Sequence, residues 1–150
     1  MDLIIASSRG KEMKKRLNKL HPRSSNLKIT VKSSLKLQDI LDDLDRYMSA
    51  VKPHQMDKCH VYLMAGLCDV TYRDHDEEFY PNTPYDEVVF NETPEDAFHR
   101  VSQIILELTN RIAEKGATPI VATIVPSGLS SWNEIRLKQR KTAFLLHHAH

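Results

Sequence analysis

The sequence predicts an α/β fold of three layers, in which helices cover both faces of a parallel sheet. Short apolar segments alternate along the 150 residues with longer segments whose apolar residues recur every three or four positions. Two of the short segments, residues 3–6 and 61–65, are almost entirely apolar, which is typical of parallel strands buried on both faces. We therefore expect a single domain over residues 1–150 with a parallel sheet of four or five strands in the flavodoxin-like order 2-1-3-4.

The strands themselves are short and are bounded by turn-forming residues. Leu27–Val31 alternates between polar and apolar side chains, so we expect a more exposed strand at the edge of the sheet. Thr118–Val125 is the fourth strand in chain order. A further short strand at Glu87–Phe90 is an option inside a long polar and acidic loop, residues 73–92.

Helices are predicted between these strands. The first covers residues 11–20, and Ser33 and Ser34 are suited to cap the second, whose apolar face runs to Val51. Thr93 followed by Pro94 is a typical helix start, and Gly116 marks the end of that helix. A capping box at Ser131–Glu134 predicts a last helix that extends to about residue 146.

The composition is that of an ordinary globular protein and excludes several classes. Hydrophobic residues make up 41% and charged residues 27% of the chain, and no run approaches the roughly 18 apolar residues that a membrane span needs. We find no signal-peptide pattern at the N-terminus. The only cysteines are Cys59 and Cys68, which fits a reducing compartment, so cytoplasm or nucleus is the expected location.

Charge is unevenly distributed although the net charge is only +1. Residues 1–36 carry ten Lys/Arg against two Asp/Glu, whereas residues 37–100 carry five against fifteen. One interpretation is that these charges simply solvate helix surfaces. The other is a basic edge for phosphate or nucleic acid, formed by the N-terminal helix. Residues 1–46 contain no Phe, Tyr or Trp, which argues against base stacking there.

Topology places a candidate site at the carboxyl ends of the first and third strands. In open α/β sheets, ligands bind where the strand order reverses, and for the order 2-1-3-4 that point lies between these two strands. Ser8 should therefore lie near Cys68 and Asp69. The start of the following helix, with Ser7, Arg9 and Gly10, is also suited to bind an anion. A purely structural alternative makes the two serines helix caps and Asp69 a loop cap.

Metals and cofactors are not expected. The acidic run Asp74–Glu78 offers oxygen ligands for Mg²⁺, but such a run is more often only solvated. The two cysteines lack the spacing of a zinc site. Loop Ser7–Gly10 also lacks the spacing of a P-loop or of a dinucleotide-binding fingerprint.

Three segments in order resemble the sequence blocks of the SGNH/GDSL hydrolase family, which are flavodoxin-like α/β esterases. The family's Gly-Asp-Ser after the first strand aligns with Ala6-Ser7-Ser8, which puts Ser8 at the nucleophile. The oxyanion-hole Gly after the second strand aligns best with Ser34. The family's Gly-x-Asn-Asp aligns with Gly66-Leu67-Cys68-Asp69, so that Cys68 replaces the oxyanion Asn.

The family's fourth block, Asp-x-x-His, has no counterpart in this sequence, which stops 24 residues after Pro126. The resemblance therefore implies a truncated or degenerate hydrolase that lacks the C-terminal strand and its catalytic base. Related domains occur in mobile elements and viruses of invertebrates, which suggests a similar origin. His75 is the internal candidate for the base.

The resemblance implies attack of Ser8 on a small ester, with weak activity because an oxyanion donor is missing. The alternative is a module without enzymatic activity that binds nucleic acid or a protein. The sequence leaves the oligomeric state open.

Overall fold

A computed structural model describes residues 1–8, 10–20, 26–74, 87–90 and 92–122 of the chain. These residues fall into two compact units. The main unit comprises residues 1–69 together with the described residues from 93 onwards, and the second contains residues 70–92. The candidate site belongs to the main unit.

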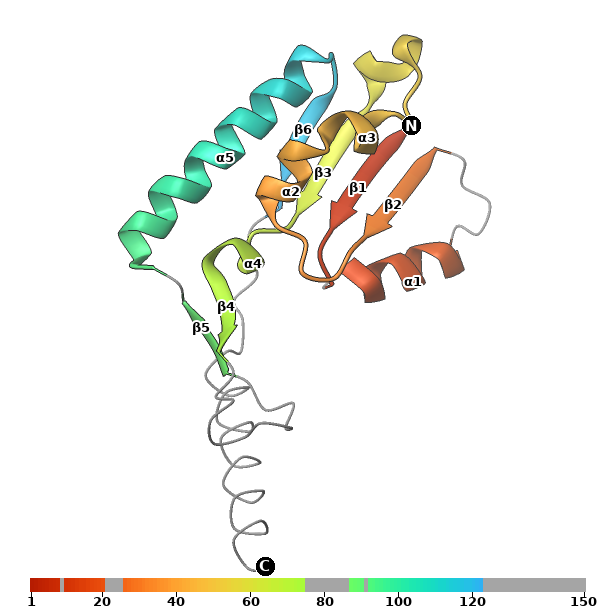
Figure 1. The fold of residues 1–150 in the computed structure, drawn as a ribbon. Helices are drawn as coiled ribbons and strands as arrows, with labels where there is room; N and C mark the ends of the chain where they lie inside the picture. The colour runs from red at the N-terminus through yellow and green to blue at the C-terminus, as the bar shows by residue number, and fades with distance from the viewer. Residues whose placement is uncertain (9, 21–25, 75–86, 91, 123–150) are drawn as a thin grey trace, which may run out of the picture. The chain divides into compact units, whose positions relative to one another are not determined.

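The main unit is built on a four-stranded sheet in which all neighbouring strands are parallel (Figure 1). The strands are β1 (Asp2–Ala6), β2 (Leu27–Val31), β3 (His60–Met64) and β6 (Thr118–Val121), and their order across the sheet is β2-β1-β3-β6. This is the predicted order 2-1-3-4, so the fold class expected from the sequence is confirmed. The edge position predicted for the second strand is also confirmed.

Burial follows from the position of each strand. Leu3 to Ala6 of β1 are all buried, as expected for a strand with neighbours on both sides and layers on both faces. In β3, Val61 and Leu63 are fully buried, while Tyr62 and Met64 on the opposite face are only partly covered by the described residues. The edge strand β2 has no fully buried residue.

Helices lie on both faces of this sheet (Figure 1). Helix α1 (Gly10–Leu20) connects β1 to β2, and because crossovers between parallel strands are right-handed it lies on the face opposite to the other helices. The second face carries α2 (Leu37–Asp42), α3 (Leu44–Met48) and the long α5 (Pro94–Glu114). A 3₁₀ helix, η1 (Pro53–Lys58), leads into β3.

The principal core lies between this second helix layer and the sheet. Large fully buried side chains come from the central strands, from the loop before α2, from α2 itself and from α5. They are Leu3, Ile5, Val61, Leu63, Leu35, Leu37, Ile40, Leu108 and Ile112. Burying an aliphatic side chain of this size contributes about 1.5–3 kcal/mol, so the loops at the strand ends are anchored to a rigid layer.

Helix α5 begins and ends where the sequence predicts. The Thr93 hydroxyl accepts a hydrogen bond from the Asp96 N–H at 3.3 Å, and Gly116 has a φ of 97° just beyond the last turn. Its Phe98, although in phase with the buried residues, is 71% exposed. The predicted helix 131–146 lies outside the described residues.

The second unit contains a two-stranded antiparallel sheet of β4 (Thr71–Asp74) and β5 (Glu87–Phe90), in which Thr71 lies opposite Phe90. The optional strand at 87–90 therefore exists, but it does not extend the parallel sheet. A short helix, α4 (Leu67–Val70), precedes β4. Within the described ranges, no helix combines the length and the apolar character that crossing a bilayer requires.

Candidate functional site

The exits of β1, β2 and β3 lie side by side at the carboxyl edge of the sheet. Ala6 is paired in register with Val31 on one side and with Met64 on the other. Two hydrogen bonds extend this pairing into the loops: Ser7 N–H donates to the Met64 carbonyl at 3.0 Å, and Lys32 N–H donates to the Ala6 carbonyl at 3.0 Å. The structure thus brings together the loop of Ser8, the loop of Ser34 and the segment that starts at Gly66.

Ser7 and Ser8 differ in exposure. Ser7 is buried, and Ser8, the next residue along, is exposed in the turn that leads into α1. The Ser7 carbonyl accepts from Gly10 N–H at 2.8 Å, and the Ser8 carbonyl accepts from Lys11 N–H at 3.2 Å. These two amides are therefore already occupied. Among the described residues, no hydrogen bond engages the N–H of Ser8, which leaves it available to a bound anion.

Gly10 has a packing reason to be glycine. A Cβ at this position would lie 2.5 Å from the Cβ of Ala6 and 3.4 Å from a methyl group of Val31. The absence of a side chain lets the first turn of α1 approach the ends of β1 and β2. The structure thus gives Gly10 a steric role, while its N–H, predicted to bind an anion, is engaged by the Ser7 carbonyl; Arg9 lies outside the described residues.

The loop after β2 carries an unusual backbone conformation. Ser34 has a φ of 60° and is the one described residue other than glycine with a positive φ. This left-handed conformation disfavours residues with a Cβ. Gly66, after β3, has a φ of 131° and occupies a second position of this kind. Both positions are ones at which the SGNH pattern has glycine.

Asp69 links the exit of β3 to the start of α2. Its side chain is 3% exposed, and its Oδ2 accepts a hydrogen bond from the N–H of Leu37 at 2.9 Å. The residue at the N-cap position of α2 is Lys36, whose ammonium group can only donate hydrogen bonds. Asp69, 32 residues further along the chain, therefore supplies the acceptor that an N-cap side chain usually provides.

The same carboxylate is held in a mixed electrostatic environment. Burial raises the pKa of Asp69 above its ordinary value, while the N–H groups of Leu37 and Gln38 and the charges of Arg100 and Lys36 act in the opposite direction. Arg100 of α5 also donates to the main-chain carbonyl of Asp69. The second carboxylate oxygen, Oδ1, is buried without a hydrogen-bond partner in the described part of the chain.

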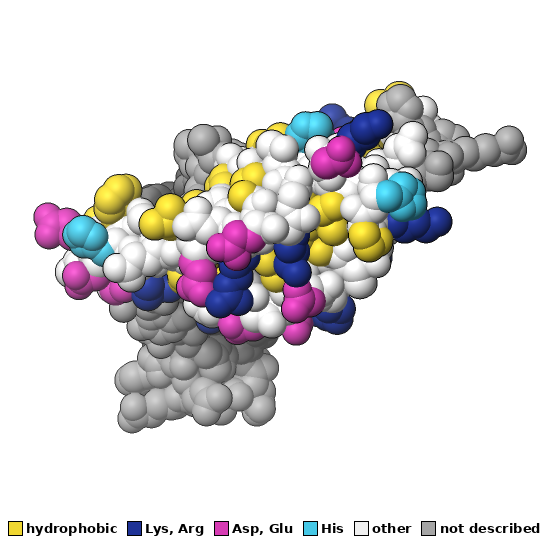
Figure 2. All heavy atoms as spheres, turned by 90° about the horizontal axis from the view of Figure 1, so that it is seen from above, with side chains coloured by type: hydrophobic (Ala, Val, Ile, Leu, Met, Phe, Trp, Pro, Cys, Tyr) yellow, Lys and Arg dark blue, Asp and Glu magenta, His cyan; other side chains and the backbone are white. Residues whose placement is uncertain are grey.

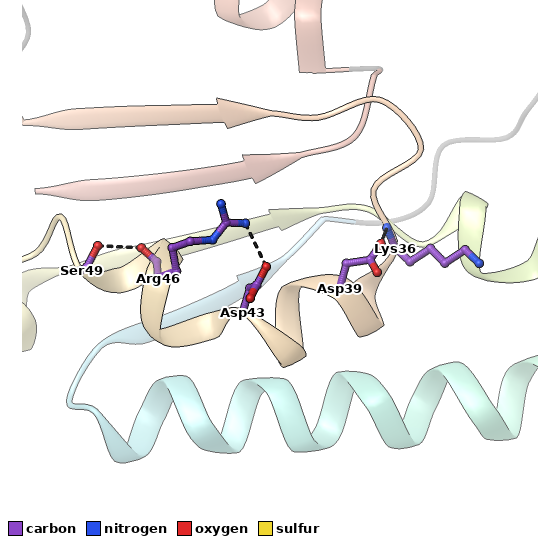
Figure 3. A network of polar contacts seen from close by, with 5 residues as sticks. All are labelled: Lys36, Asp39, Asp43, Arg46 and Ser49. Carbon is purple, nitrogen blue, oxygen red and sulfur yellow. Dashed lines mark hydrogen bonds and ion pairs between the residues drawn. The ribbon is translucent and has the colours of Figure 1, made fainter.

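Local polar contacts complete the start of α2 and continue along α3 (Figure 3). The Asp39 carboxylate accepts from the N–H of Lys36 at 2.9 Å. Two carboxylates therefore accept from N–H groups at the start of α2, those of Asp39 and Asp69. Arg46 pairs with Asp43 at 2.9 Å, and the Ser49 hydroxyl donates to the Arg46 carbonyl at 2.7 Å. The helix begins at Leu37, so Ser33 and Ser34 do not cap it as the sequence suggested.

Of the remaining predicted site residues, the structure describes Cys68. Cys68 is half-buried, and Cys59 is buried. His75, the candidate base, lies outside the described residues. Within the described ranges, no group of three or more His, Cys, Asp and Glu side chains is arranged to hold a metal ion.

One surface pocket lies away from this edge, between α2, α3 and the end of α5. It has a volume of about 290 Å³, its lining includes Leu41 and Arg111, and the ion pair of Lys115 with Asp45 borders it. The surface at the amino-terminal ends of the strands shows acidic and basic side chains interspersed (Figure 2). Neither region has a feature that points to a particular chemistry.

No family model, curated protein or solved structure matches this chain. The class that the structure defines is therefore an α/β fold with a flavodoxin-like strand order.

The sequence pattern singled out Asp69 after the third strand but did not indicate its hydrogen-bond partner, Leu37. The link to Leu37 joins residues 32 positions apart, and no local pattern encodes it. Arg100 was also missed, since one arginine in the first turns of an amphipathic helix carries no distinctive signal. The one available clue was the lysine at the N-cap position of α2, which lacks a side-chain acceptor of its own.

Proposed function

We propose that the chain is an SGNH-like serine hydrolase of ester bonds, with Ser8 as the nucleophile and with low activity. The observation that carries the proposal is the position of Ser8. It is exposed, it lies two residues after the end of β1, and its own N–H is not engaged by the described residues. Beside it lie the exits of β2 and β3, where this fold type binds ligands.

The backbone at two further positions supports the alignment with the family pattern. Ser34 adopts a left-handed conformation where the family has its oxyanion-hole glycine, and Gly66 does so at the start of the third block. A serine at the first of these positions keeps the shape of the loop at some conformational cost. The loop geometry is therefore compatible with the family's arrangement even where the residue type differs.

The chemistry proposed is acyl transfer. Ser8 Oγ attacks the ester carbonyl carbon, the bond to the leaving alcohol breaks, and water then releases the acid from the acyl-enzyme. The N–H of Ser8, together with Ser34, would stabilise the oxyanion. Cys68 stands where the family has an Asn donor, and loss of one such donor lowers kcat by about 10²–10³. Activity is therefore expected to be weak.

Covalent labelling tests this proposal. The 150-residue protein is incubated with a fluorophosphonate probe, and the modified residue is located by mass spectrometry. We expect labelling of the wild type and of Ser33→Ala, a matched control in the neighbouring exposed loop, and none of Ser8→Ala. Absence of labelling in the wild type, or equal labelling of Ser8→Ala, would contradict the proposal. His75→Ala is expected to slow labelling if His75 is the base.

A further inference from the structure

Three lysines form a row along the outer surface of α1. Lys11, Lys15 and Lys19 are all exposed and follow one another at four-residue intervals. At a rise of 1.5 Å per residue, adjacent members lie about 6 Å apart along the axis and the row spans about 12 Å. The opposite side of the helix carries Met13 and Leu17, which are half-buried. The row is thus fixed on an anchored helix and points to solvent.

The charge of this surface is not neutralised by the helix itself. Lys14 and Arg16 flank the row, and Glu12 is the single acid between residues 10 and 20. Glu12 is itself engaged, because its carboxylate accepts from the Arg16 guanidinium at 3.3 Å. The helix therefore carries five cationic side chains whose positive field extends to a docking partner.

We propose that this row binds the phosphate backbone of a nucleic acid, independently of the activity proposed for Ser8. Its span of about 12 Å matches the axial rise of three to four nucleotides of one duplex strand, at 3.4 Å each. Lysine ammonium groups act as flexible point charges and bind phosphates without demanding one geometry. A row of lysines on a straight helix is suited to a regular array of phosphates.

Other polyanions fit this surface less well. A helix that lies in a membrane surface inserts an apolar face, but the apolar side chains Met13 and Leu17 are partly covered by the protein. Recognition of a single phosphorylated side chain typically uses clustered arginines with bidentate geometry. Helix α1 offers no Phe, Tyr or Trp on which bases could stack, and contacts to phosphates carry no sequence information, so we expect binding that does not depend on sequence.

Salt-dependent binding to dye-labelled oligonucleotides tests the proposal, with the full 150-residue chain and with single-stranded and duplex probes of mixed sequence. The test variant is Lys11→Gln/Lys15→Gln/Lys19→Gln, which removes the row without adding helix-breaking residues. Each duplex phosphate contact contributes about 0.9 to the slope of log K against log salt, so the slope should decrease by about 2.7. Between about 50 and 200 mM salt, the wild type should lose about 40-fold more affinity than the variant.

The control is Lys52→Gln/Lys58→Gln/Lys115→Gln, which removes the same number of positive charges from exposed positions outside α1; Lys115→Gln also removes the ion pair with Asp45. It should leave the slope almost unchanged. Equal effects of the two triple variants would show that net charge alone matters and would overturn the proposal. So would an absence of binding at low salt, or binding to anionic lipid vesicles without binding to either oligonucleotide.

Discussion

Replacing Asp69 separates its role as a hydrogen-bond acceptor from its role as a buried charge. Asp69→Ala removes the acceptor and leaves the N–H of Leu37, a buried group, without its partner. An unsatisfied buried donor costs about 1–3 kcal/mol, and loss of a helix N-cap costs about 0.5–2 kcal/mol for the same bond. Because these two figures describe one interaction, we expect a loss of about 1–3 kcal/mol in the free energy of unfolding.

Asp69→Asn should be much milder. The amide oxygen can accept from Leu37 N–H, while the charge that burial disfavours is gone. The amide nitrogen, which is a donor, then occupies the position of Oδ1, which has no hydrogen-bond partner among the described residues, so part of this gain is offset. We therefore expect this variant to retain at least ~1 kcal/mol of the stability that Asp69→Ala loses.

Both Asp69 variants should differ from the wild type in the pH dependence of stability. Burial raises the pKa of Asp69 in the folded protein, so the folded chain keeps its proton at pH values where the unfolded chain has lost it. The contribution of Asp69 to stability is therefore largest below the unfolded pKa, about 3.9, and decreases as the pH rises through the folded pKa. Asp69→Asn cannot titrate, so its stability relative to the wild type should increase over that window.

Urea unfolding followed by circular dichroism measures these differences at a series of pH values, and unchanged m-values would show that the comparison holds. Asp57→Ala and Asp57→Asn, at an exposed position in η1, serve as controls and should have little effect. Equal losses for Asp69→Ala and Asp69→Asn would refute the capping role. If the stability of Asp69→Asn depended on pH in the same way as that of the wild type, the argument that burial raises the pKa of Asp69 would be refuted.

Substitutions at three further positions test the local geometry of the site. Gly10→Ala should lower stability, because overpacking against Ala6 costs about 1–3 kcal/mol and outweighs the gain of about 1 kcal/mol in helix propensity. Thermal unfolding measures this loss of stability, and a higher Tm in the variant would contradict the prediction. Ser34→Gly should be neutral or stabilising by up to ~1 kcal/mol, while Ser34→Val should be destabilising, because left-handed backbone costs about 1–2 kcal/mol for residues with a Cβ. If chemical denaturation finds the Gly variant more stable than the Val variant, the loop conformation is confirmed. The reverse order of stability rejects it. Cys68→Asn should raise the rate of hydrolysis of a small activated ester by about 10²-fold if the Asn side chain restores an oxyanion donor. If the rate is unchanged in a protein whose Ser8 reacts with the fluorophosphonate probe, position 68 does not contribute to an oxyanion hole.

The parallel sheet was predictable because its strands have a local signature. Leu3–Ala6 is a short apolar run followed by a polar turn, and these residues are buried in β1, which has a neighbouring strand on each side. Handedness and strand order then follow from general rules, without knowledge of any contact. The hairpin of β4 and β5 was not predictable in the same way, because its strands lie in a long polar segment and pair with each other rather than with the core sheet.

Helix faces were less predictable than helix ends. Thr93 and Gly116 act through backbone conformation and local hydrogen bonds, so a few residues are enough to recognise them. Phe98 is in phase with the buried residues of α5, and Leu20 with the half-buried Met13 and Leu17 of α1, yet both are 71% exposed. Periodicity identifies a face but does not say how far the adjoining layer extends.

Asp69 shows why the location of a site is easier to infer than the role of its residues. Asp69 follows β3 in the sequence, and in a parallel sheet the carboxyl ends of all strands lie at the same edge. Its role depends on which donor faces it, and that donor is the N–H of Leu37, brought there by the crossover from β2. A carboxylate committed to capping α2 is a positioning group, so the proposed chemistry must rest on Ser8 and the amides around it. The Asp69 and Ser8 variants therefore report on separate properties, stability for the first and covalent reactivity for the second.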